Sequence, residues 1–300
     1  MYKKAGFELT ETESPDLELF SQYAEAVALC VVSAKITDDM IDHLPNLKVI
    51  SRFGSGTDNI SSGAAGRRGI RITNIPEFCL SEVADHTMAL LLGAARKLLA
   101  MDQATRSGRW QARVQERMHR IEGRQLGLIG FGGIAREVAR RAVPFGLRVA
   151  AADPQLNRES AEAAGVQLMD LNQLLATSHF VSLHVPLTAS TYHLIGEEQL
   201  ARMRQDAILI NTARGAVVNE GALIRALQEQ RIAGAALDVF EGLNLFGPAP
   251  DDLDHPLFHL PNVLLSPHAA GCSEESLSFL MRRGAENAVE AVLEGKLVPL

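Results

Sequence analysis

The stretch Gly130-Phe131-Gly132-Gly133-Ile134-Ala135 decides how this chain folds. An apolar run at 126–129 precedes it and has the character of a buried strand, and a helical pattern over 137–145 follows it. A second apolar run at 147–151 ends shortly before Asp153. This order of strand, glycine turn, helix, strand and acidic residue is typical of a Rossmann unit that binds a dinucleotide.

Each part of the turn has a physical reason. Gly130 permits the tight turn, and Gly132 lets the backbone approach a pyrophosphate with no Cβ in the way. The third position, Ala135, is small enough for helix and strand to pack closely, and the pyrophosphate then sits at the helix N-terminus. Asp153 is expected to accept hydrogen bonds from the adenosine ribose and to repel a 2′-phosphate. We therefore expect NAD rather than NADP.

Composition and charge exclude several classes of protein. Hydrophobic residues make up 47% and charged residues 22% of 300 residues, which predicts a globular protein with room for two domains. The net charge of −7 argues against nucleic acid as the main partner. The three cysteines lie far apart, which favours a reducing compartment and no metal site. With no run resembling a signal peptide or a membrane span, we expect a cytosolic protein.

Strand and helix patterns alternate throughout, which predicts an α/β fold with parallel sheets. A long helix is expected to begin near Ser81, a good N-cap, and to end in Arg96-Lys97. Residues 106–110 have the pattern of a turn that leads into an irregular arm, and a final helix is expected from Ser273 to about Glu294. The expected strands are 27–32, 47–51 and 70–73, followed by 126–129, 147–151, 180–183, 207–210, 234–237 and 263–265.

These patterns suggest two domains. Residues 1–93 with 273–300 would form a small, flavodoxin-like α/β domain for the substrate, and 94–272 a doubly wound Rossmann domain for NAD. Residues 3–9 look like a helix end followed by a strand, and the strand expected before them in a wound domain is missing. Either the chain is truncated, or its start was mis-assigned, or this domain is smaller than usual.

Further motifs match one enzyme family in order and spacing. They are RFGSGTDNI at 52–60, EVADHT at 82–87, HVPLT at 184–188, NTARG at 211–215, DVF at 238–240 and SPH at 266–268. With them the chain resembles the D-isomer-specific 2-hydroxyacid dehydrogenases, the family of phosphoglycerate dehydrogenase and hydroxypyruvate reductase. The resemblance runs from about Val49 to the last helix, nearly the whole length of the chain.

The resemblance implies NAD-dependent interconversion of a small D-2-hydroxy acid and its 2-oxo acid, of the phosphoglycerate or the hydroxypyruvate/glyoxylate type. Arg214 offers a planar fork suited to a carboxylate. His268 follows another strand and can act as base in oxidation and as acid in reduction. Asp238 would hold the nicotinamide carboxamide, and the amides around Ser55 and Gly56 would bind the substrate carboxylate.

The glycine turn and the resemblance together assign the contacts with NAD. The resemblance also implies a homodimer, joined through the cofactor domain. No other partner than the small acid is expected: no nucleic acid, no membrane and no metal. The assigned cofactor residues are Thr87, Gly130, Gly132, Gly133, Ile134, Asp153, His184, Val185, Thr212, Ala213 and Asp238.

One motif departs from the family's pattern. The family usually places a glutamate five residues after the aspartate of Asp-Val-Phe, where it bonds the histidine and raises its pKa. That position, 238 + 5 = 243, is Leu243 here. Glu241 is the nearby carboxylate, and we hypothesise that the rebuilt loop brings it to His268 as a catalytic partner. The alternative is a solvent-facing loop glutamate.

Two other interpretations stay open. One is an NAD(H)-sensing binding protein resembling the C-terminal-binding-protein corepressors, with little or no turnover, which the missing glutamate favours. The presence of Arg214 and His268 argues for catalysis instead. The other is dehydrogenation of a different small anion, since relatives that act on formate and phosphite share the scaffold. Arg52 and Arg71 could supply charge for a phosphorylated substrate, or serve in packing.

Overall fold

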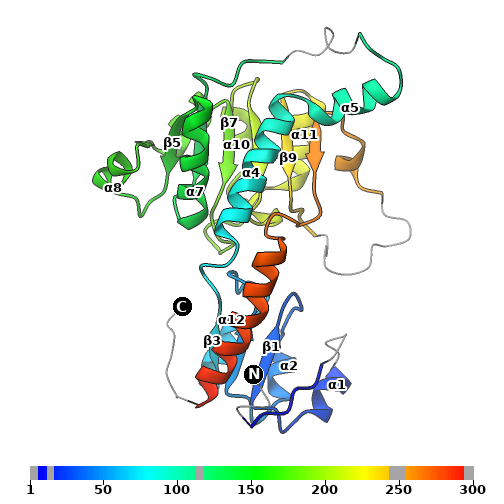
Figure 1. The fold of residues 1–300 in the computed structure, drawn as a ribbon, viewed down its shortest axis with the longest axis vertical. Helices are drawn as coiled ribbons and strands as arrows, with labels where there is room; N and C mark the ends of the chain where they lie inside the picture. Colours follow the sequence, from blue (N-terminus) through cyan, green and yellow to red (C-terminus); the bar gives the residue numbers. More distant parts are fainter. Residues whose placement is uncertain (1–5, 12–16, 112–117, 243–253, 294–300) are drawn as a thin grey trace. The chain divides into compact units, whose positions relative to one another are not determined.

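A computed structural model describes residues 6–11, 17–111, 118–242 and 254–293 (Figure 1). The chain forms two compact units, Met1–Phe78 with Cys272–Leu300, and Cys79–Gly271. The first boundary therefore lies ahead of helix α4 (Leu80–Ala95), whereas we expected it near the end of that helix. Helix α4 groups with the larger unit because it packs on helix α7 and on the sheet of that unit.

The larger unit contains a seven-stranded parallel sheet. The strand order is β10-β9-β8-β7-β4-β5-β6, so the chain winds outward in both directions from the boundary between β4 and β7. This is the doubly wound topology of a Rossmann domain, and it confirms the expected fold class. The strands are β4 (Gln125–Ile129), β5 (Arg148–Ala152), β6 (Gln167–Leu168), β7 (Phe180–Leu183), β8 (Ile208–Asn211), β9 (Gly234–Leu237) and β10 (Val263–Leu265).

Helices cover both faces of this sheet: α4 and α7 pack side by side on one face (Figure 1), and α9, α10 and α11 cover the other. Neighbouring residues of β8 point into different apolar clusters, Leu209 into one and Ile210 into the other. The strands are continuous apolar runs because both of their faces are buried. The helical segments are α5 (Leu98–Arg106), α7 (Gly133–Ala142), η2 (Val143–Phe145), α8 (Arg158–Ala163), α9 (Leu171–Thr177), α10 (Glu197–Arg202), η3 (Gly215–Val217), α11 (Glu220–Gln228) and η4 (Pro256–His259).

Helix α4 begins differently from the sequence-based expectation. The residue at its N-cap is Cys79, which has a left-handed backbone with φ 54°, and the helix starts at Leu80. Ser81, the expected N-cap, lies inside the first turn, and its hydroxyl accepts a hydrogen bond of 2.7 Å from Arg141. Ser81 therefore does not cap the helix, because its hydroxyl binds the side chain of a distant arginine instead.

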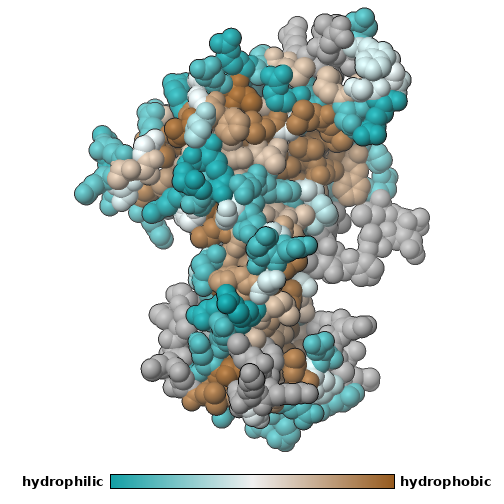
Figure 2. Space-filling view, viewed as in Figure 1, coloured by the Kyte–Doolittle hydropathy of each residue, from teal (hydrophilic) through white to brown (hydrophobic). Residues whose placement is uncertain are grey.

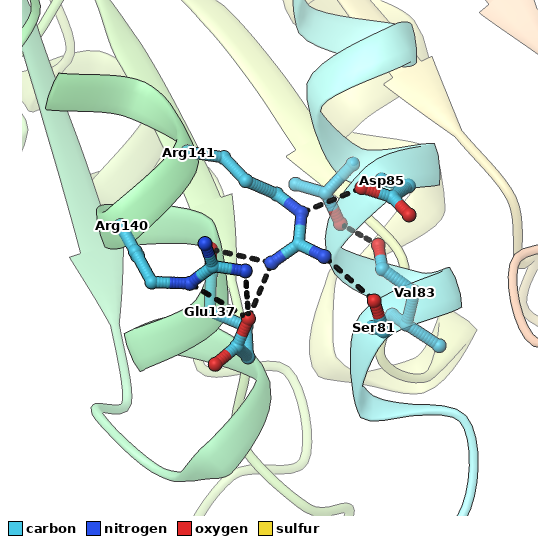
Figure 3. Close-up of polar contacts among 7 residues, drawn as sticks. Ser81, Val83, Asp85, Glu137, Arg140 and Arg141 are labelled. Carbon is cyan, nitrogen blue, oxygen red and sulfur yellow. Dashed lines mark hydrogen bonds and ion pairs between the residues drawn. The ribbon is translucent and has the colours of Figure 1, made fainter. Parts of the chain in front are cut away.

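Arg141 of α7 fastens the first turns of α4 to α7 (Figure 3). Its Nε lies 2.6 Å from a carboxylate oxygen of Asp85, and another of its nitrogens lies 2.7 Å from the Ser81 hydroxyl. It also contacts Glu137, which Arg140 holds at 2.8 Å. The hydrogen bond with Asp85 raises the pKa of Arg141, so this half-buried guanidinium stays charged. The clamp joins α4 to the helix that follows the glycine turn.

Helix α5 was not expected from the sequence. It follows Lys97, which has a left-handed backbone with φ 51°. Leu98 and Leu99 are about half exposed, and Ala104 is its buried residue. The segment does carry an amphipathic pattern, but it follows directly on Arg96 and Lys97, where we expected the preceding helix to end, and the left-handed turn at Lys97 that starts a second helix is not visible in the sequence.

The smaller unit contains a three-stranded parallel sheet in the order β1-β2-β3. Residues 7–11 form no strand, so the strand expected within 3–9 is not found in its described part. Helix α12 packs on all three strands, and the buried Ser51 hydroxyl donates to the Gly284 carbonyl at 2.9 Å. The elements are α1 (Leu17–Gln22), β1 (Ala28–Val31), α2 (Asp38–Asp42), β2 (Val49–Arg52), α3 (Ser62–Arg67), β3 (Arg71–Thr73) and α12 (Glu274–Leu293).

Candidate active site at the edge of the larger sheet

The assigned residues of the larger unit gather at one edge of its sheet, where the strands end. Because all seven strands are parallel, their carboxyl ends meet at this edge, and ligands of such sheets bind there beside the topological switch. The switch in this chain lies between β4 and β7. The turns at this edge carry Gly130 after β4, Asp153 after β5, His184 after β7, Thr212, Ala213 and Arg214 after β8, Asp238 after β9 and His268 after β10.

The turn after β4 admits only glycine at its first position. Gly130 has φ 85°, and a Cβ there would lie 2.6 Å from the carbonyl oxygen of His184. The Gly130 amide donates to the Ala152 carbonyl at 2.9 Å, and the His184 amide donates to the Ile129 carbonyl at 2.8 Å. The ends of β4, β5 and β7 are thereby drawn together around this turn.

The residues after this turn fit a dinucleotide. A Cβ at Gly132 would meet no atom of the chain within 4 Å, so the space in front of the N-terminus of α7 is open. The Asp153 carboxylate accepts from the amides of Phe131 at 2.8 Å and Gln155 at 2.7 Å. These bonds fix the carboxylate, and each of its oxygens keeps a lone pair for a ribose hydroxyl.

His184 is a half-buried histidine whose surroundings favour the neutral form. Its Nε2 lies 2.9 Å from the Ser182 hydroxyl, and burial lowers the pKa of His184 to about 4. An imidazole with such a low pKa is poorly matched to proton transfer near pH 7. Its place beside Gly130, with Val185 next to it, is consistent with the cofactor contact assigned to this pair.

The turn that carries Arg214 is braced by Asn211, which sequence reasoning did not single out. The Asn211 side chain accepts from the Ala213 amide at 3.0 Å and donates to the Arg214 carbonyl at 2.8 Å. The Thr212 hydroxyl lies 2.9 Å from the buried Thr87 hydroxyl of α4. An asparagine at a strand end is a signal for such a turn, because its amide can bond the backbone two or three residues on.

The Arg214 turn touches the segment that follows β9. A Cβ on Gly215 would overlap the carbonyl of Phe240 and would lie 2.5 Å from the amide nitrogen of Glu241. Glycine is therefore required at position 215 for two backbone segments to come this close. The close approach sets the path of the chain on both sides, including that of Arg214.

Asp238 organises the turn that carries His268. Its backbone carbonyl accepts from the His268 amide at 2.8 Å. Its carboxylate accepts from the Ala269 amide and from the Ala270 amide, each at 2.9 Å. His268 itself has a left-handed backbone with φ 54°, which a non-glycine residue adopts only where its surroundings hold it. Sequence reasoning assigned Asp238 to the nicotinamide and did not foresee this role.

The Asp238 carboxylate is completely buried and still ionised. Burial by itself would raise the pKa of Asp238, but hydrogen bonds from His86, Ser266 and the two amides outweigh it and hold the pKa below its usual value. The Ser266 hydroxyl donates to it at 2.5 Å, and the His86 Nε2 lies 3.5 Å away. A fixed negative charge thus lies directly beneath the His268 turn.

Glu241 contacts a different histidine from the one expected. One of its carboxylate oxygens lies 2.6 Å from Nε2 of His193, whose ring stacks on Tyr192 with centroids 4.0 Å apart. The carboxylates of Glu241 and Glu220 each accept from the backbone amide of the other, at 3.3 and 3.0 Å. The contacts found for Glu241 in the described residues are with these groups, and its pairing with His268 stays a prediction.

The conformation that brings His193 to Glu241 is set in the loop between β7 and α10. His193 has a left-handed backbone with φ 52°, and its amide donates to the Ala216 carbonyl at 2.9 Å. This conformation presents the imidazole to Glu241 at short range, which a sequence pattern does not reveal. On the other side, Glu220 pairs with His255 at 3.0 Å. Leu243, where the family's glutamate would stand, lies outside the described residues.

Ser55 and Gly56 lie in the smaller unit, in the turn after β2. The Ser55 carbonyl accepts from the Asn74 side chain at 2.7 Å, which holds this turn against the segment after β3. Ser55 is exposed and Gly56 half-buried. The described residues contain no group of histidine, cysteine and acidic side chains that could hold a metal, and no helix of theirs is long and apolar enough to cross a membrane.

Comparisons with known proteins agree with this arrangement. Residues 88–270 match the model of the D-isomer specific 2-hydroxyacid dehydrogenase NAD binding domain. The chain is 42% identical over 267 residues to the glyoxylate reductase of Korarchaeum cryptofilum, which covers 88% of this chain and 78% of that protein. It is 40% identical over 284 residues to the D-3-phosphoglycerate dehydrogenase of Methanocaldococcus jannaschii, covering 93% of this chain and 52% of that protein.

A solved structure is also similar. The D-lactate dehydrogenase of Aquifex aeolicus, complexed with NAD and lactic acid, superposes with a TM-score of 0.86 at 30% sequence identity. The match covers 98% of this chain and 92% of that one.

Proposed function

The chain belongs to the D-isomer-specific 2-hydroxyacid dehydrogenase family, and on that premise we propose that it reduces a small, unphosphorylated 2-oxo acid of the glyoxylate or hydroxypyruvate type. It is an NAD-dependent oxidoreductase that interconverts 2-hydroxy and 2-oxo acids. The observation that carries the finer proposal is the pair of braced turns after β8 and β10, which present Arg214 and His268 at the cofactor edge of the sheet.

Each residue has a defined task in the proposed reaction. When bound, NADH supplies the hydride for the carbonyl carbon. The guanidinium of Arg214 pairs with the substrate carboxylate and stabilises the negative charge that develops on the carbonyl oxygen. His268 donates a proton to that oxygen during reduction and accepts it during oxidation. Gly132 would leave room for the pyrophosphate, and the Asp153 carboxylate would accept from the ribose hydroxyls.

The preference for an unphosphorylated acid rests on two arginines of the smaller unit. Arg52 donates to the Asn59 side chain at 3.2 Å, and Arg71 donates to the Ala291 carbonyl at 3.5 Å. Both guanidiniums thus serve contacts within their own unit, which supports packing rather than a phosphate site. The amides around Ser55 and Gly56, in the same unit, remain our proposed contacts for the substrate carboxylate.

The proposal is tested by following NADH oxidation with glyoxylate, hydroxypyruvate and phosphohydroxypyruvate. We expect turnover with the first two, a kcat/KM at least about 10-fold lower with the phosphorylated acid, and poor use of NADPH because of Asp153. Preference for phosphohydroxypyruvate would overturn the substrate proposal. Tight NADH binding without turnover of any oxo acid would instead identify a sensor protein of the corepressor type.

We also propose that two copies pair through the α5 side of the larger unit. A hollow of about 1640 Å³ lies there, and its lining includes Leu99, Leu257 and Leu260. The space-filling view shows hydrophobic surface on this part of the molecule (Figure 2). Leu98, Leu99 and Trp110 are half to two-thirds exposed beside it, which is unusual for a protein that works as a monomer.

Replacing Leu99 by Glu is expected to shift the protein from dimer to monomer, because a carboxylate cannot be buried in an apolar interface without a partner. Size-exclusion chromatography with light scattering measures the mass. Leu277→Glu is the matched control, since Leu277 is equally exposed but lies on α12 of the smaller unit. If both variants keep the mass of the parent protein, the interface lies elsewhere.

For the units themselves we propose separate tasks. The larger unit would hold NAD, and the smaller one would supply the substrate-carboxylate turn at Ser55. We place the protein in the cytoplasm, since all three cysteines are thiols, which suits a reducing compartment.

A further inference from the structure

Three consecutive residues of α4 contact three different parts of the larger unit. Asp85 pairs with Arg141 of α7 (Figure 3). Thr87 bonds Thr212 in the turn after β8. Between them, His86 reaches the turn after β10, where its Nε2 lies 2.8 Å from the hydroxyl oxygen of Ser266. The first two contacts serve the cofactor helix and the Arg214 turn, and the third has no role in the reaction as described above.

The geometry around Ser266 determines which group donates each hydrogen bond. The Ser266 hydroxyl donates its hydrogen to the Asp238 carboxylate at 2.5 Å, so its oxygen can only accept from His86. His86 must therefore carry a hydrogen on Nε2, and the chain of donation runs from His86 to Ser266 to Asp238. This order also excludes Ser266 as a nucleophile, because its proton is directed to the carboxylate and not to the imidazole.

The carboxylate at the end of this chain is costly to keep charged. Asp238 is fully buried, and its carboxylate accepts from Ser266 and from the amides of Ala269 and Ala270, while the His86 Nε2 lies 3.5 Å away. Two of these donors are the amides of the very turn that carries His268. If the hydrogen bond from His86 to Ser266 is lost, the charge on Asp238 is less well compensated. The turn that the Asp238 carboxylate holds can then shift.

We propose that His86 is a positioning residue that fixes the His268 turn through Ser266 and the buried Asp238 carboxylate. It touches neither the substrate nor the cofactor in this role. The inference rests on the proposed function of His268 as the proton donor. It goes further, because it gives a task to the histidine of the EVADHT motif that neither the motif nor the family resemblance assigned.

The test compares two replacements of His86 that differ in one property. Leucine fills similar space but donates no hydrogen bond, whereas the amide nitrogen of glutamine can stand where Nε2 stood. We expect His86→Leu to lower kcat about 10- to 100-fold, as a misplaced proton donor does, with NADH affinity unchanged. His86→Gln should recover most of the loss. Asp85→Asn is the control for general loosening of α4, and its kcat should stay close to that of the parent enzyme.

A second variant removes the middle member of the hydrogen-bond series His86–Ser266–Asp238. Ser266→Ala should lower kcat by a similar factor, and the double variant His86→Leu with Ser266→Ala should be no worse than either single one, because both remove the same chain. Full additivity of the two losses would overturn the proposal. If His86→Leu does not fold, Ser266→Ala alone keeps the test decisive, because an unchanged kcat in that variant would also overturn the proposal.

Amide exchange provides a readout that needs no turnover. Hydrogen–deuterium exchange of the peptide containing 266–270 should be faster in His86→Leu and close to the parent rate in His86→Gln. Unchanged exchange together with unchanged kcat in His86→Leu would refute the positioning role. A parent protein that shows the exchange pattern but turns over no oxo acid would refute the proposed function and leave the positioning role standing.

Discussion

Replacing His268 by Asn is expected to lower kcat for oxo-acid reduction by about 10²- to 10⁴-fold, because the carbonyl oxygen loses its proton donor. Asn is the suitable replacement, since His268 has φ 54° and Asn tolerates the left-handed region better than most side chains. The backbone hydrogen bond with Asp238 should therefore persist, and the loss should report on the imidazole alone.

Steady-state kinetics give kcat, and the quenching of protein fluorescence gives the dissociation constant of NADH, which should change little. His259→Asn is the matched control, because His259 lies on η4 and its side chain is 71% exposed. A kcat for His268→Asn within about threefold of the parent value would mean that another group donates the proton. His184 would not qualify, because burial lowers its pKa to about 4.

Gly215→Ala is expected to be the most damaging single-atom change in the larger unit. The added Cβ would overlap the Phe240 carbonyl, and backbone atoms cannot move aside as the end of a side chain can. Overpacking of this kind costs about 1 to 3 kcal/mol of folding free energy. Because Gly215 follows Arg214, we also expect kcat/KM to fall by about 10²-fold as the guanidinium is displaced.

Thermal unfolding and initial-rate kinetics measure the two effects of Gly215→Ala. Gly221→Ala is the control: it lies in α11, and its Cβ would meet nothing closer than 3.7 Å. There the substitution should leave the rate unchanged and raise stability by about 0.5 to 1 kcal/mol, as helical Gly→Ala changes do. A stable and fully active Gly215→Ala variant would show that the segment after β9 can move away freely.

The features that could be predicted from the sequence are those set by local rules. The glycine turn before α7 follows from backbone sterics at Gly130 and from strand and helix patterns on either side. The doubly wound arrangement could be inferred from the same repeat, because a chain of alternating strands and helices has few ways to wind. The sheet topology confirmed this fold class.

The features that escaped prediction depend on residues far apart in the chain. Ser81 has the local character of an N-cap, but the bond with Arg141 outweighs it. Glu241 stands near the position of the family's glutamate, but a left-handed turn at His193 brings a different imidazole to it. In each case the observed partner comes from a residue far away in the sequence, and a pattern of neighbouring residues does not reveal it.

A third group of residues lies within the motifs themselves and could have been recognised there. Asn211 and Ser266 are the first residues of NTARG and SPH, and sequence reasoning passed over both in favour of the charged residues that follow. Their bonds to the turns beyond them show what they do. Short polar side chains at strand ends are a usable signal, since they can bond the backbone that follows.

The division of the chain also has a consequence for its synthesis. The ribosome completes β1, β2 and β3 early, but α12, which packs on them, lies beyond the whole of Cys79–Gly271. At ordinary translation speeds this delay lasts about 10 to 40 s. During that time the sheet face that α12 covers lacks this helix, so we expect the nascent smaller unit to need protection by chaperones until the last helix emerges.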